Sequence, residues 1–333
     1  MPEKIAFNQK TLTRKTANHR GVPPGVLRLV LPATSANLGP AFDAAALAMD
    51  IYISVEARPA PSFAIHATGR DPEICQALEN HLILSTYRDV LQAQGKPIVP
   101  LSLRIKNEMP IGKGCGSSAA ARLAGIAMAN HFGGLRWTDS QIINEASRRE
   151  RHPDNASACW MGGLAVARMS ADGEAQVVRI QPKGKWPLLL AIPERPLPTE
   201  EARHVLPAQY SRADAVSNIQ NSLLLLAAFI QGRHDLLASA LVDRIHQPYR
   251  ARLCPLLPCL QELTGKPGVL GSALSGAGAS VLMFLDPGAN LQKTKKSIAD
   301  HLTKSGLRAE LLLTSITLRG ARHNQFKPSK NLG

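Results

Sequence analysis

The sequence predicts an α+β fold, and three kinds of observation carry this prediction. Residues 48–56 and 101–107 alternate apolar with polar side chains, which is the period of a half-buried strand, and the mainly apolar run at 26–31 is also expected to be a strand. Residues 80–94 and 119–130 lack Pro and each leads to a glycine, which predicts helices with glycine stops. The length of 333 residues is enough for two domains or one large bilobed domain.

The composition is that of a soluble globular protein. Hydrophobic residues make up 44% and charged residues 19%, and we find no apolar run long enough to cross a membrane. The first residues lack the apolar core of a secretory signal. The cysteines, Cys75, Cys115, Cys159, Cys254 and Cys259, are odd in number and lack zinc-site spacing. We therefore expect a cytoplasmic protein with reduced cysteines and no membrane partner.

The formal net charge of +14 raises the question of nucleic-acid binding. Residues 1–24 carry five Lys or Arg against one Glu, and residues 319–333 carry four against no acid, which leaves +6 for the rest. We expect disordered basic tails at 1–24 and 321–333. Aromatic residues, at 4%, are too few for a base-stacking platform, so no nucleic-acid partner is expected. A basic nucleic-acid-binding protein remains the alternative from another class.

The strand at 26–31 leads into PATSANLGPAFD at 32–43. Its density of Pro, Ser, Asn and Gly predicts an ordered loop. Asn37 and Asp43 are the polar groups expected to point into whatever this loop encloses. An Asx-type turn that closes on itself is the alternative.

The stretch PIGKGCGSSAAA at 110–121 lies between a predicted strand and a predicted helix. Gly112, Gly114 and Gly116 alternate in it and allow the backbone to approach a ligand closely. Unpaired N–H groups and the helix dipole converge where the loop enters the helix, so we expect the loop to hold phosphate. The Walker A and GxGxxG spacings are not matched. A tight turn without a ligand is the alternative.

The rest of the chain continues the mixture of strands and helices. RRERHPDN at 148–155 gathers charge and His. From the residues alone it is either a functional cluster or only a solvated helix end with a Pro stop. We place a domain boundary near residue 185. Strands are expected at 164–169, 176–180, 188–192, on both sides of a glycine loop (275–279) within 268–285, and at 309–318; helices are expected from Thr199 and at 211–231, 233–243, 255–264 and 289–304.

Two of these stretches resemble motifs of the GHMP kinases. The loop at 110–121 is similar to the family's PxxxGLGSSAA, with Cys115 in place of Leu. SGAGA at 275–279 is similar to the SGAGP of its third motif, with Ala279 in place of Pro. Cys115 is expected to pack as a substitute for Leu, and a reactive thiol beside a helix N-terminus is the alternative.

Two further stretches resemble the homoserine kinases within that family. PATSANLGPAFD is similar to their signature PATSANLGPGFD, with Ala41 in place of a Gly that permits positive φ. ERHPDN is similar to their EGHPDN, with Arg151 in place of Gly. The motifs follow one another in the family's order across most of residues 27–318.

The resemblance implies an N-terminal domain like ribosomal protein S5 domain 2 (25–185), a ferredoxin-like C-terminal domain (186–320) and a homodimer. It also implies ATP-dependent phosphorylation of the side-chain hydroxyl of L-homoserine to O-phospho-L-homoserine, a step of threonine biosynthesis. Another small-molecule GHMP kinase and a low-activity paralogue are the alternatives.

The resemblance assigns five residues to the substrate, namely Asn37, Asp43, His152, Arg203 and Arg250. By this resemblance Asp43 meets the ammonium group, and the two arginines suit bidentate recognition of the carboxylate. For either arginine alone, a solvated or paired surface residue is the alternative.

The resemblance also implies an ATP site with Mg²⁺. Ser118 and Glu150 are the expected metal ligands, since Mg²⁺ takes hard oxygen ligands. Asn80 is expected near the adenine, one residue upstream of the family's place, where His81 stands. The expected contacts of the phosphate loop with ATP are Pro110, Gly112, Gly114, Cys115, Gly116, Ser117, Ser118 and Ala119.

By the resemblance, Asn155 stands where mevalonate kinase and galactokinase have an Asp base and where homoserine kinases have Asn. An amide takes no proton at neutral pH, and phosphoryl transfer through a loose transition state needs little activation of the nucleophile. We therefore expect direct attack by the homoserine hydroxyl, with Asn155, Ser118 and Glu150 as catalytic residues. Asp154 is the rival base.

Overall fold

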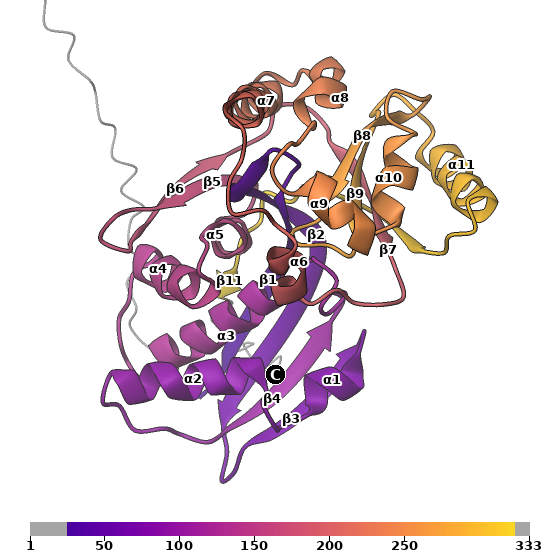
Figure 1. Ribbon diagram of the computed structural model, residues 1–333. Helices are drawn as coiled ribbons and strands as arrows, with labels where there is room; N and C mark the ends of the chain where they lie inside the picture. Colours follow the sequence, from indigo (N-terminus) through magenta and orange to yellow (C-terminus); the bar gives the residue numbers. More distant parts are fainter. Residues whose placement is uncertain (1–24, 324–333) are drawn as a thin grey trace, which may run out of the picture.

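The computed structural model describes residues 25–323, which form two sheets flanked by helices (Figure 1). Within these residues the first sheet has the order β11-β1-β2-β4-β3, with β5 paired to β2 and β6 to β5. Its β3–β4 pair is parallel and its other pairs are antiparallel. The strands are β1 (Leu27–Asn37), β2 (Ala41–Pro59), β3 (Ala64–Gly69), β4 (Leu101–Asn107), β5 (Leu164–Met169), β6 (Ala175–Ile180) and β11 (Arg322–His323).

The loop predicted at 32–43 is instead a β-hairpin, and this corrects the sequence analysis. β1 continues to Asn37, and β2 begins at Ala41 after a short turn. The register jumps from Ala36 opposite Ala46 to Asn37 opposite Ala41, so residues 42–45 bulge out of the β1–β2 ladder. A bulge bends the strand and re-aims its side chains, which is why Pro, Asn and Gly are tolerated here.

Helices cover one face of the first sheet, with α3 (Ser117–Phe132) and α5 (Asp154–Met161) packed against β1. The other helices of this half are α1 (Pro72–Gln76), α2 (Leu82–Ala93) and α4 (Asp139–Glu150). The sequence analysis predicted α2 and α3 and gave a helix end at 148–155 as an alternative, which is where α4 ends, but it gave no element for β3, α1 or α5. Thr138 and Gln141 form a capping box at the start of α4, a sequence signal that was available.

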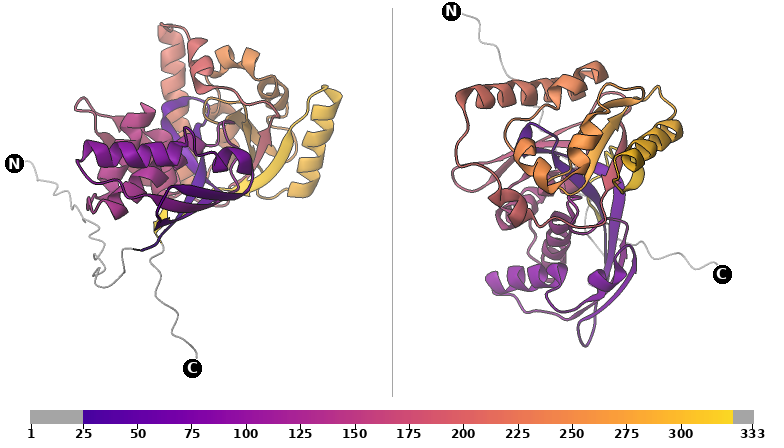
Figure 2. Two further views of the ribbon diagram at one scale, coloured as in Figure 1. Left: turned by 90° about the horizontal axis from the view of Figure 1, so that it is seen from below. Right: turned by 45° about the vertical axis from the view of Figure 1, so that its right-hand side comes forward.

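The second sheet is antiparallel, in the order β10-β7-β9-β8, and both of its faces are buried. Leu188 and Leu190 of β7 face one core cluster, and the alternate residues Leu189 and Ala191 face the other. The second cluster lies under α10 (Leu256–Gln261) and α11 (Leu291–Lys304), and α11 is peripheral in both views of Figure 2. The strands are β7 (Pro187–Ile192), β8 (Val269–Leu274), β9 (Val281–Leu285) and β10 (Glu310–Ser315).

The connection between β7 and β8 is mainly helical. Besides α10, its helices are α6 (Thr199–His204), α7 (Arg212–Gln231), α8 (Leu237–Ala240) and α9 (Gln247–Arg250), with 3₁₀ turns η1 (His234–Leu236) and η2 (Ala251–Leu253). The helix predicted at 233–243 is therefore broken into two short pieces. The strand predicted at 309–318 ends at Ser315.

The end of the described chain returns to the first sheet. Ile316 forms a bridge with Met49, and β11 pairs with β1, so the basic tail predicted from residue 321 begins as a strand. Residues 316–320, predicted to belong to the C-terminal domain, thus contact the first sheet. The tails predicted at 1–24 and from 324 onwards lie outside the described residues.

α7 has one face in the core, through Leu225, Ala228 and Phe229. Among the described residues it is the helix whose length and composition would allow it to cross a membrane, although the sequence analysis found no such run. Length and composition are weak evidence for a membrane span, because core helices of soluble proteins pass the same test.

Candidate active site

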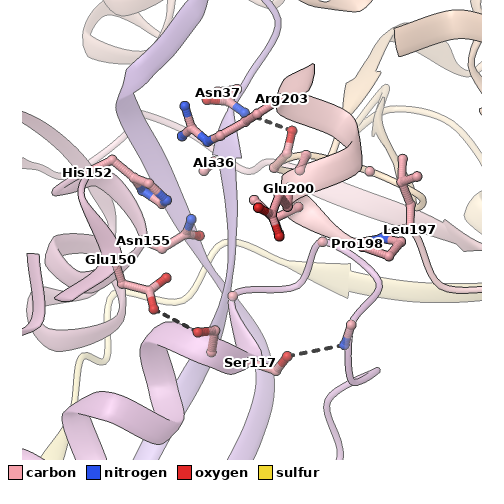
Figure 3. Close-up of a pocket in the computed structure, with 18 of the residues that line it drawn as sticks. Ala36, Asn37, Ser117, Glu150, His152, Asn155, Leu197, Pro198, Glu200 and Arg203 are labelled. Atoms are coloured by element: carbon pink, nitrogen blue, oxygen red, sulfur yellow. Dashed lines mark hydrogen bonds between the residues drawn. The ribbon is translucent and has the colours of Figure 1, made fainter. Parts of the chain in front are cut away.

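A cavity of about 1020 Å³ lies where the two halves of the chain meet. The β1–β2 hairpin, the loop before α3, α4, α5, α6 and the glycine loop at 275–279 all contribute to its lining. Glu150, His152 and Asn155 point into it from one side, and Arg203 and Glu200 face them from the other (Figure 3).

The loop before α3 has the backbone expected of an anion site. Gly112, Gly114 and Gly116 have φ values of 68°, 78° and 69°, and all three line the cavity. In the described part of the chain, the backbone N–H groups of Gly114, Gly116 and Ser117 donate to no protein acceptor. Together with the positive end of α3, whose first turn has no acid, these groups suit a phosphate.

The glycine loop at 275–279 packs directly against this loop. The Ser275 hydroxyl donates to the Gly114 carbonyl at 2.6 Å. A Cβ on Gly114 would lie 2.1 Å from the Ser275 carbonyl oxygen, so a larger residue does not fit. The Gly278–Ala279 peptide is cis, at the position where the family motif has Pro.

A second, more apolar cavity of about 650 Å³ adjoins the first. The two share Gly112, Ser117 and Ser118, so they meet at the phosphate loop. Asn80 lines the second cavity, with the apolar side chains of Ile53 and other residues around it. A flat apolar ligand group beside a phosphate site fits this pair of cavities.

Two predicted contacts of the phosphate loop lie elsewhere. Pro110 and Ala119 are buried and line neither cavity. Cys115 belongs to the lining, but its side chain is fully buried in the core. Burial raises the pKa of its thiol to about 12, which fits a substitute for Leu and not a reactive thiol.

Glu150 and Ser118 lie together at the edge of the phosphate loop. The Ser118 hydroxyl donates to Glu150 Oε1 at 2.7 Å, and Arg122 Nε donates to the same oxygen at 2.6 Å. A carboxylate and a hydroxyl at this spacing are hard oxygen donors of the kind that Mg²⁺ binds, so the residues present fit that ion. Arg151 follows at φ 67°, as the left-handed C-cap of α4, which is where the family motif has Gly.

His152, Asp154 and Asn155 form a hydrogen-bonded group at the start of α5. His152 Nδ1 lies 2.5 Å from Asp154 Oδ1, and the Asn155 backbone N–H donates to the same oxygen at 2.6 Å. Burial alone would lower the pKa of His152, but the hydrogen bond and charge of Asp154, with Asp43 and Glu150 nearby, outweigh it and raise that pKa.

Thr34 fixes the orientation of the Asn155 amide. Its hydroxyl donates to Asn155 Oδ1 at 2.6 Å, and the Asn155 amide nitrogen donates to Asp154 Oδ1 at 3.3 Å, which leaves one amide N–H of Asn155 as the available donor. A Cβ on Gly116 would lie 1.9 Å from Thr34 Oγ1, so the glycine permits this close packing.

Asp43 stands on the bulge of β2, at φ 53°, and forms a bidentate ion pair with Arg203 of α6. Arg203 NH1 donates to Asp43 Oδ2 at 3.0 Å, and NH2 donates to Oδ1 at 2.8 Å. Asn37 supports Asp43 by accepting its backbone N–H at 2.9 Å, and donates to the Gly276 carbonyl at 2.7 Å. Ala41 lies outside the positive-φ residues, so its replacement of Gly carries no backbone strain.

Arg250 lines the cavity although only 1% of its surface is exposed. Its Nε donates to the Ala202 carbonyl at 2.9 Å, and NH1 lies 3.1 Å from His246 Nδ1. Burial and the neighbouring Arg203 lower the pKa of Arg250 to about 10, so it remains a cation at neutral pH.

All five predicted substrate residues therefore line one cavity, beside the predicted metal ligands. The sequence analysis missed Arg122, Thr34 and His246, together with the cavity wall at 196–200. His246 stands four residues before Arg250, a helical spacing that places the two side chains together. The contacts of Thr34 join distant parts of the chain and leave no local signal.

Two family models match the chain. Residues 81–163 match "GHMP kinases N terminal domain", and residues 225–304 match "GHMP kinases C terminal". A homoserine kinase from Solibacter usitatus is 40% identical over 88% of this chain and 95% of its own length. One from Deinococcus radiodurans is 35% identical over 84% of this chain and 91% of its own length.

Solved structures share the fold. A homoserine kinase from Cytophaga hutchinsonii superposes with a TM-score of 0.77 at 23% identity, covering 90% of this chain and 98% of that one. A phosphomevalonate kinase from Streptococcus pneumoniae superposes with a TM-score of 0.60 at 15% identity, covering 88% of this chain and all of that one. The α+β fold predicted from the sequence, with the GHMP kinase architecture that the resemblance implied, is therefore confirmed.

Proposed function

The chain belongs to the homoserine kinases of the GHMP kinase family, and we propose that it transfers the γ-phosphoryl group of ATP to the side-chain hydroxyl of L-homoserine. One observation carries the choice of acceptor. Asp43, Arg203 and Arg250 place one carboxylate and two guanidinium groups in a cavity that also contains the phosphate loop. Recognition of a free amino acid needs an anion for its ammonium group and a cation for its carboxylate, and here both stand beside a phosphate site.

ATP would span the two adjoining cavities. Its adenine suits the apolar cavity that Asn80 borders, and its phosphates suit the N–H groups of Gly114, Gly116 and Ser117. Ser118 and Glu150 would hold Mg²⁺, which supplies neutralisation of phosphate charge when bound. Arg122 keeps Glu150 in place by its hydrogen bond, and its own charge lies at the cavity wall.

The reaction then depends on positioning and charge. The homoserine oxygen forms a bond to the γ-phosphorus, the bond to the bridging oxygen breaks with its electrons leaving on ADP, and the hydroxyl proton passes to phosphate or solvent. Asn155 offers its amide N–H towards the reacting groups, because Thr34 occupies its oxygen. Asn155 thus orients the acceptor but takes no proton.

Asp154 is the rival base, and its surroundings argue for an orienting role. It is 1% exposed, and one oxygen accepts from both His152 and Asn155. If the hydroxyl attacks directly, Asp154→Asn should mainly raise the KM for homoserine. A base role would instead lower kcat by about a thousandfold or more with KM unchanged.

An ADP-release assay with Mg-ATP and L-homoserine, L-serine, L-threonine or mevalonate tests the proposal. We expect turnover selective for homoserine. Arg203→Ala should raise the KM for homoserine by about tenfold to a hundredfold and leave the KM for ATP unchanged, since one charge-assisted contact is lost. Arg233→Ala is the matched control, because Arg233 is an exposed arginine paired with Asp235 away from the cavity. Turnover of mevalonate in preference to homoserine would contradict the proposal.

The setting and assembly complete the proposal. All five cysteines are unpaired and buried, which supports a reducing compartment, and we place the protein in the cytoplasm, with threonine biosynthesis as its pathway.

We also propose a homodimer. One face of α7 exposes Val216, Ile219, Leu223 and Ile230 at 45%, 60%, 63% and 46%, and a second copy would cover this apolar stripe.

A further inference from the structure

We propose that His246 is a positioning residue that holds the guanidinium of Arg250 for the substrate carboxylate. This inference rests on the proposed function, in which Arg250 binds that carboxylate. His246 is fully buried and lines no part of the cavity, so it cannot touch the substrate itself. Its ring joins the turn of the β1–β2 hairpin, through Gly39, to Arg250 in α9.

The two partners of the ring select one tautomer. His246 Nε2 lies 2.8 Å from the Gly39 carbonyl oxygen, which can only accept, so Nε2 carries the proton. His246 Nδ1 lies 3.1 Å from Arg250 NH1, which can only donate, so Nδ1 presents a lone pair. The neutral imidazole with its proton on Nε2 satisfies both contacts. Burial lowers the pKa of His246 to about 4, against the opposing charge of Asp243, in keeping with this neutral form.

Three contacts fix the guanidinium of Arg250. Nε donates to the Ala202 carbonyl, NH1 donates to His246, and the group lies 5.2 Å from the ring centroid of Phe42. In the described chain NH2 has no protein acceptor. Since Arg250 is almost fully buried but lines the cavity, the edge of the guanidinium that remains is the part a carboxylate can reach.

Contacts with the Phe42 ring tie both arginines to the strand that carries Asp43. The Phe42 ring stacks on His246 at 5.1 Å with an interplanar angle of 25°. Arg203 lies 5.5 Å from that ring, on which Arg250 also rests. Phe42 and His246 therefore form an aromatic platform next to Asp43, and His246 adds the hydrogen bond that sets the rotation of Arg250.

Two amide variants separate the two hydrogen bonds of His246. His246→Asn places an acceptor near the position of Nδ1 and keeps the bond to Arg250. His246→Gln places a donor near the position of Nε2 and keeps the bond to Gly39. We expect His246→Gln to raise the KM for L-homoserine about tenfold to a hundredfold, and His246→Asn to raise it no more than about threefold. The KM for ATP should stay within about twofold in both, because neither contact faces the phosphate loop.

Equal effects of the two variants on homoserine, or an equal rise of both KM values, would overturn the inference. Arg250→Lys separates this outcome from failure of the proposed function. If Arg250→Lys leaves the KM for homoserine unchanged, the carboxylate role of Arg250 is wrong and the inference falls with it. If it raises that KM while His246→Gln does not, only the role of His246 is wrong.

The full-length wild-type protein offers a measurement that does not depend on the folding of a variant. In protein labelled with ¹⁵N-histidine, we expect the ring assigned to His246 to remain neutral from pH 7 to pH 5 with its proton on Nε2, and its Nδ1 resonance to shift when L-homoserine binds. Protonation of the His246 ring on Nδ1, or its titration in this range, would contradict the geometry. An Nδ1 resonance unmoved by saturating homoserine would contradict the link to the substrate.

Discussion

Cys115 stands inside the phosphate loop, yet its side chain points into the core. The thiol is fully buried, lies 3.8 Å from the Lys113 carbonyl and replaces a Leu of the family motif with a smaller apolar group. Arg151 is a different kind of departure, because it takes the left-handed conformation that the family's Gly adopts without strain. That conformation costs a non-glycine residue about 1 kcal/mol, which the contacts around the cavity must offset.

The buried thiol leads to a prediction about reactivity. Because burial raises the pKa of Cys115 to about 12, almost no thiolate exists at pH 8, and iodoacetamide should leave Cys115 unmodified in the native protein. The unfolded thiol ionises near pH about 8.5, so its contribution to stability is complete below that pH and is lost as the pH rises towards about 12. Mass spectrometry after labelling, with and without urea, measures the extent to which Cys115 is modified in the native and in the unfolded protein. Rapid native labelling of Cys115 that ATP slows would show a reactive thiol instead.

At the scale of elements, the site depends on two glycine loops that touch. The phosphate loop comes from the first half of the chain and the 275–279 loop from the second, and the Ser275 hydroxyl joins them at Gly114. A side chain at Gly114 would also lie 2.6 Å from the Gly278 carbonyl oxygen, so the contact is backbone against backbone on both sides. Neither loop can shift without the other.

Gly114→Ala therefore tests this contact. The added Cβ meets two carbonyl oxygens at a φ of +78°, and we expect a loss of about 3 kcal/mol or more in the free energy of unfolding, together with a higher KM for ATP. Gly95→Ala is the matched control, since Gly95 has a φ of +60° with nothing within 4 Å. It should lose only about 1 kcal/mol. Urea unfolding measures both, and equal losses would mean that backbone strain alone, and not the contact, limits this position.

On the scale of the whole molecule, one core cluster runs through both halves. It includes Leu29 and Leu47 of the first sheet with Leu190 and Phe284 of the second, and Phe229 of α7 belongs to it as well. The cavity lies at this junction, so its two walls are held by a shared core. The face of α7 turned away from that core carries the apolar stripe on which the proposed dimer depends.

Replacing a stripe residue should therefore separate the subunits without unfolding them. Leu223 is 63% exposed, so Leu223→Glu adds charge to the surface of a monomer but buries an unpaired charge in a dimer. Light scattering should give twice the monomer mass for the wild type and the monomer mass for the variant. Val178→Glu, at an equally exposed apolar position on β6, is the control and should remain dimeric. A monomeric wild type would contradict the proposal.

The sequence predicted the features whose causes are local. Alternation fixed the position of β4, and the alternate glycines located the start of α3 within a few residues. The bulge at 42–45 was missed because it arises where β1 and β2 lose register. The residue pattern of one strand does not show how that strand pairs with another. The contact of His246 with Gly39 was missed for a similar reason, since the two residues are distant in the sequence, whereas the spacing of His246 to Arg250 was a local signal.

In the structure Asp43 and Arg203 neutralise each other across the cavity. A molecule with a single charged end could satisfy one of them only by depriving the other of its counterion, which costs more the less water the group can reach. A zwitterion replaces both partners in one exchange, so each protein charge gives up one counterion and receives another. Admission of a zwitterion to the cavity is thus an ion-pair swap, and this disfavours a simple amine, which would pair with Asp43 and leave Arg203 without its counterion.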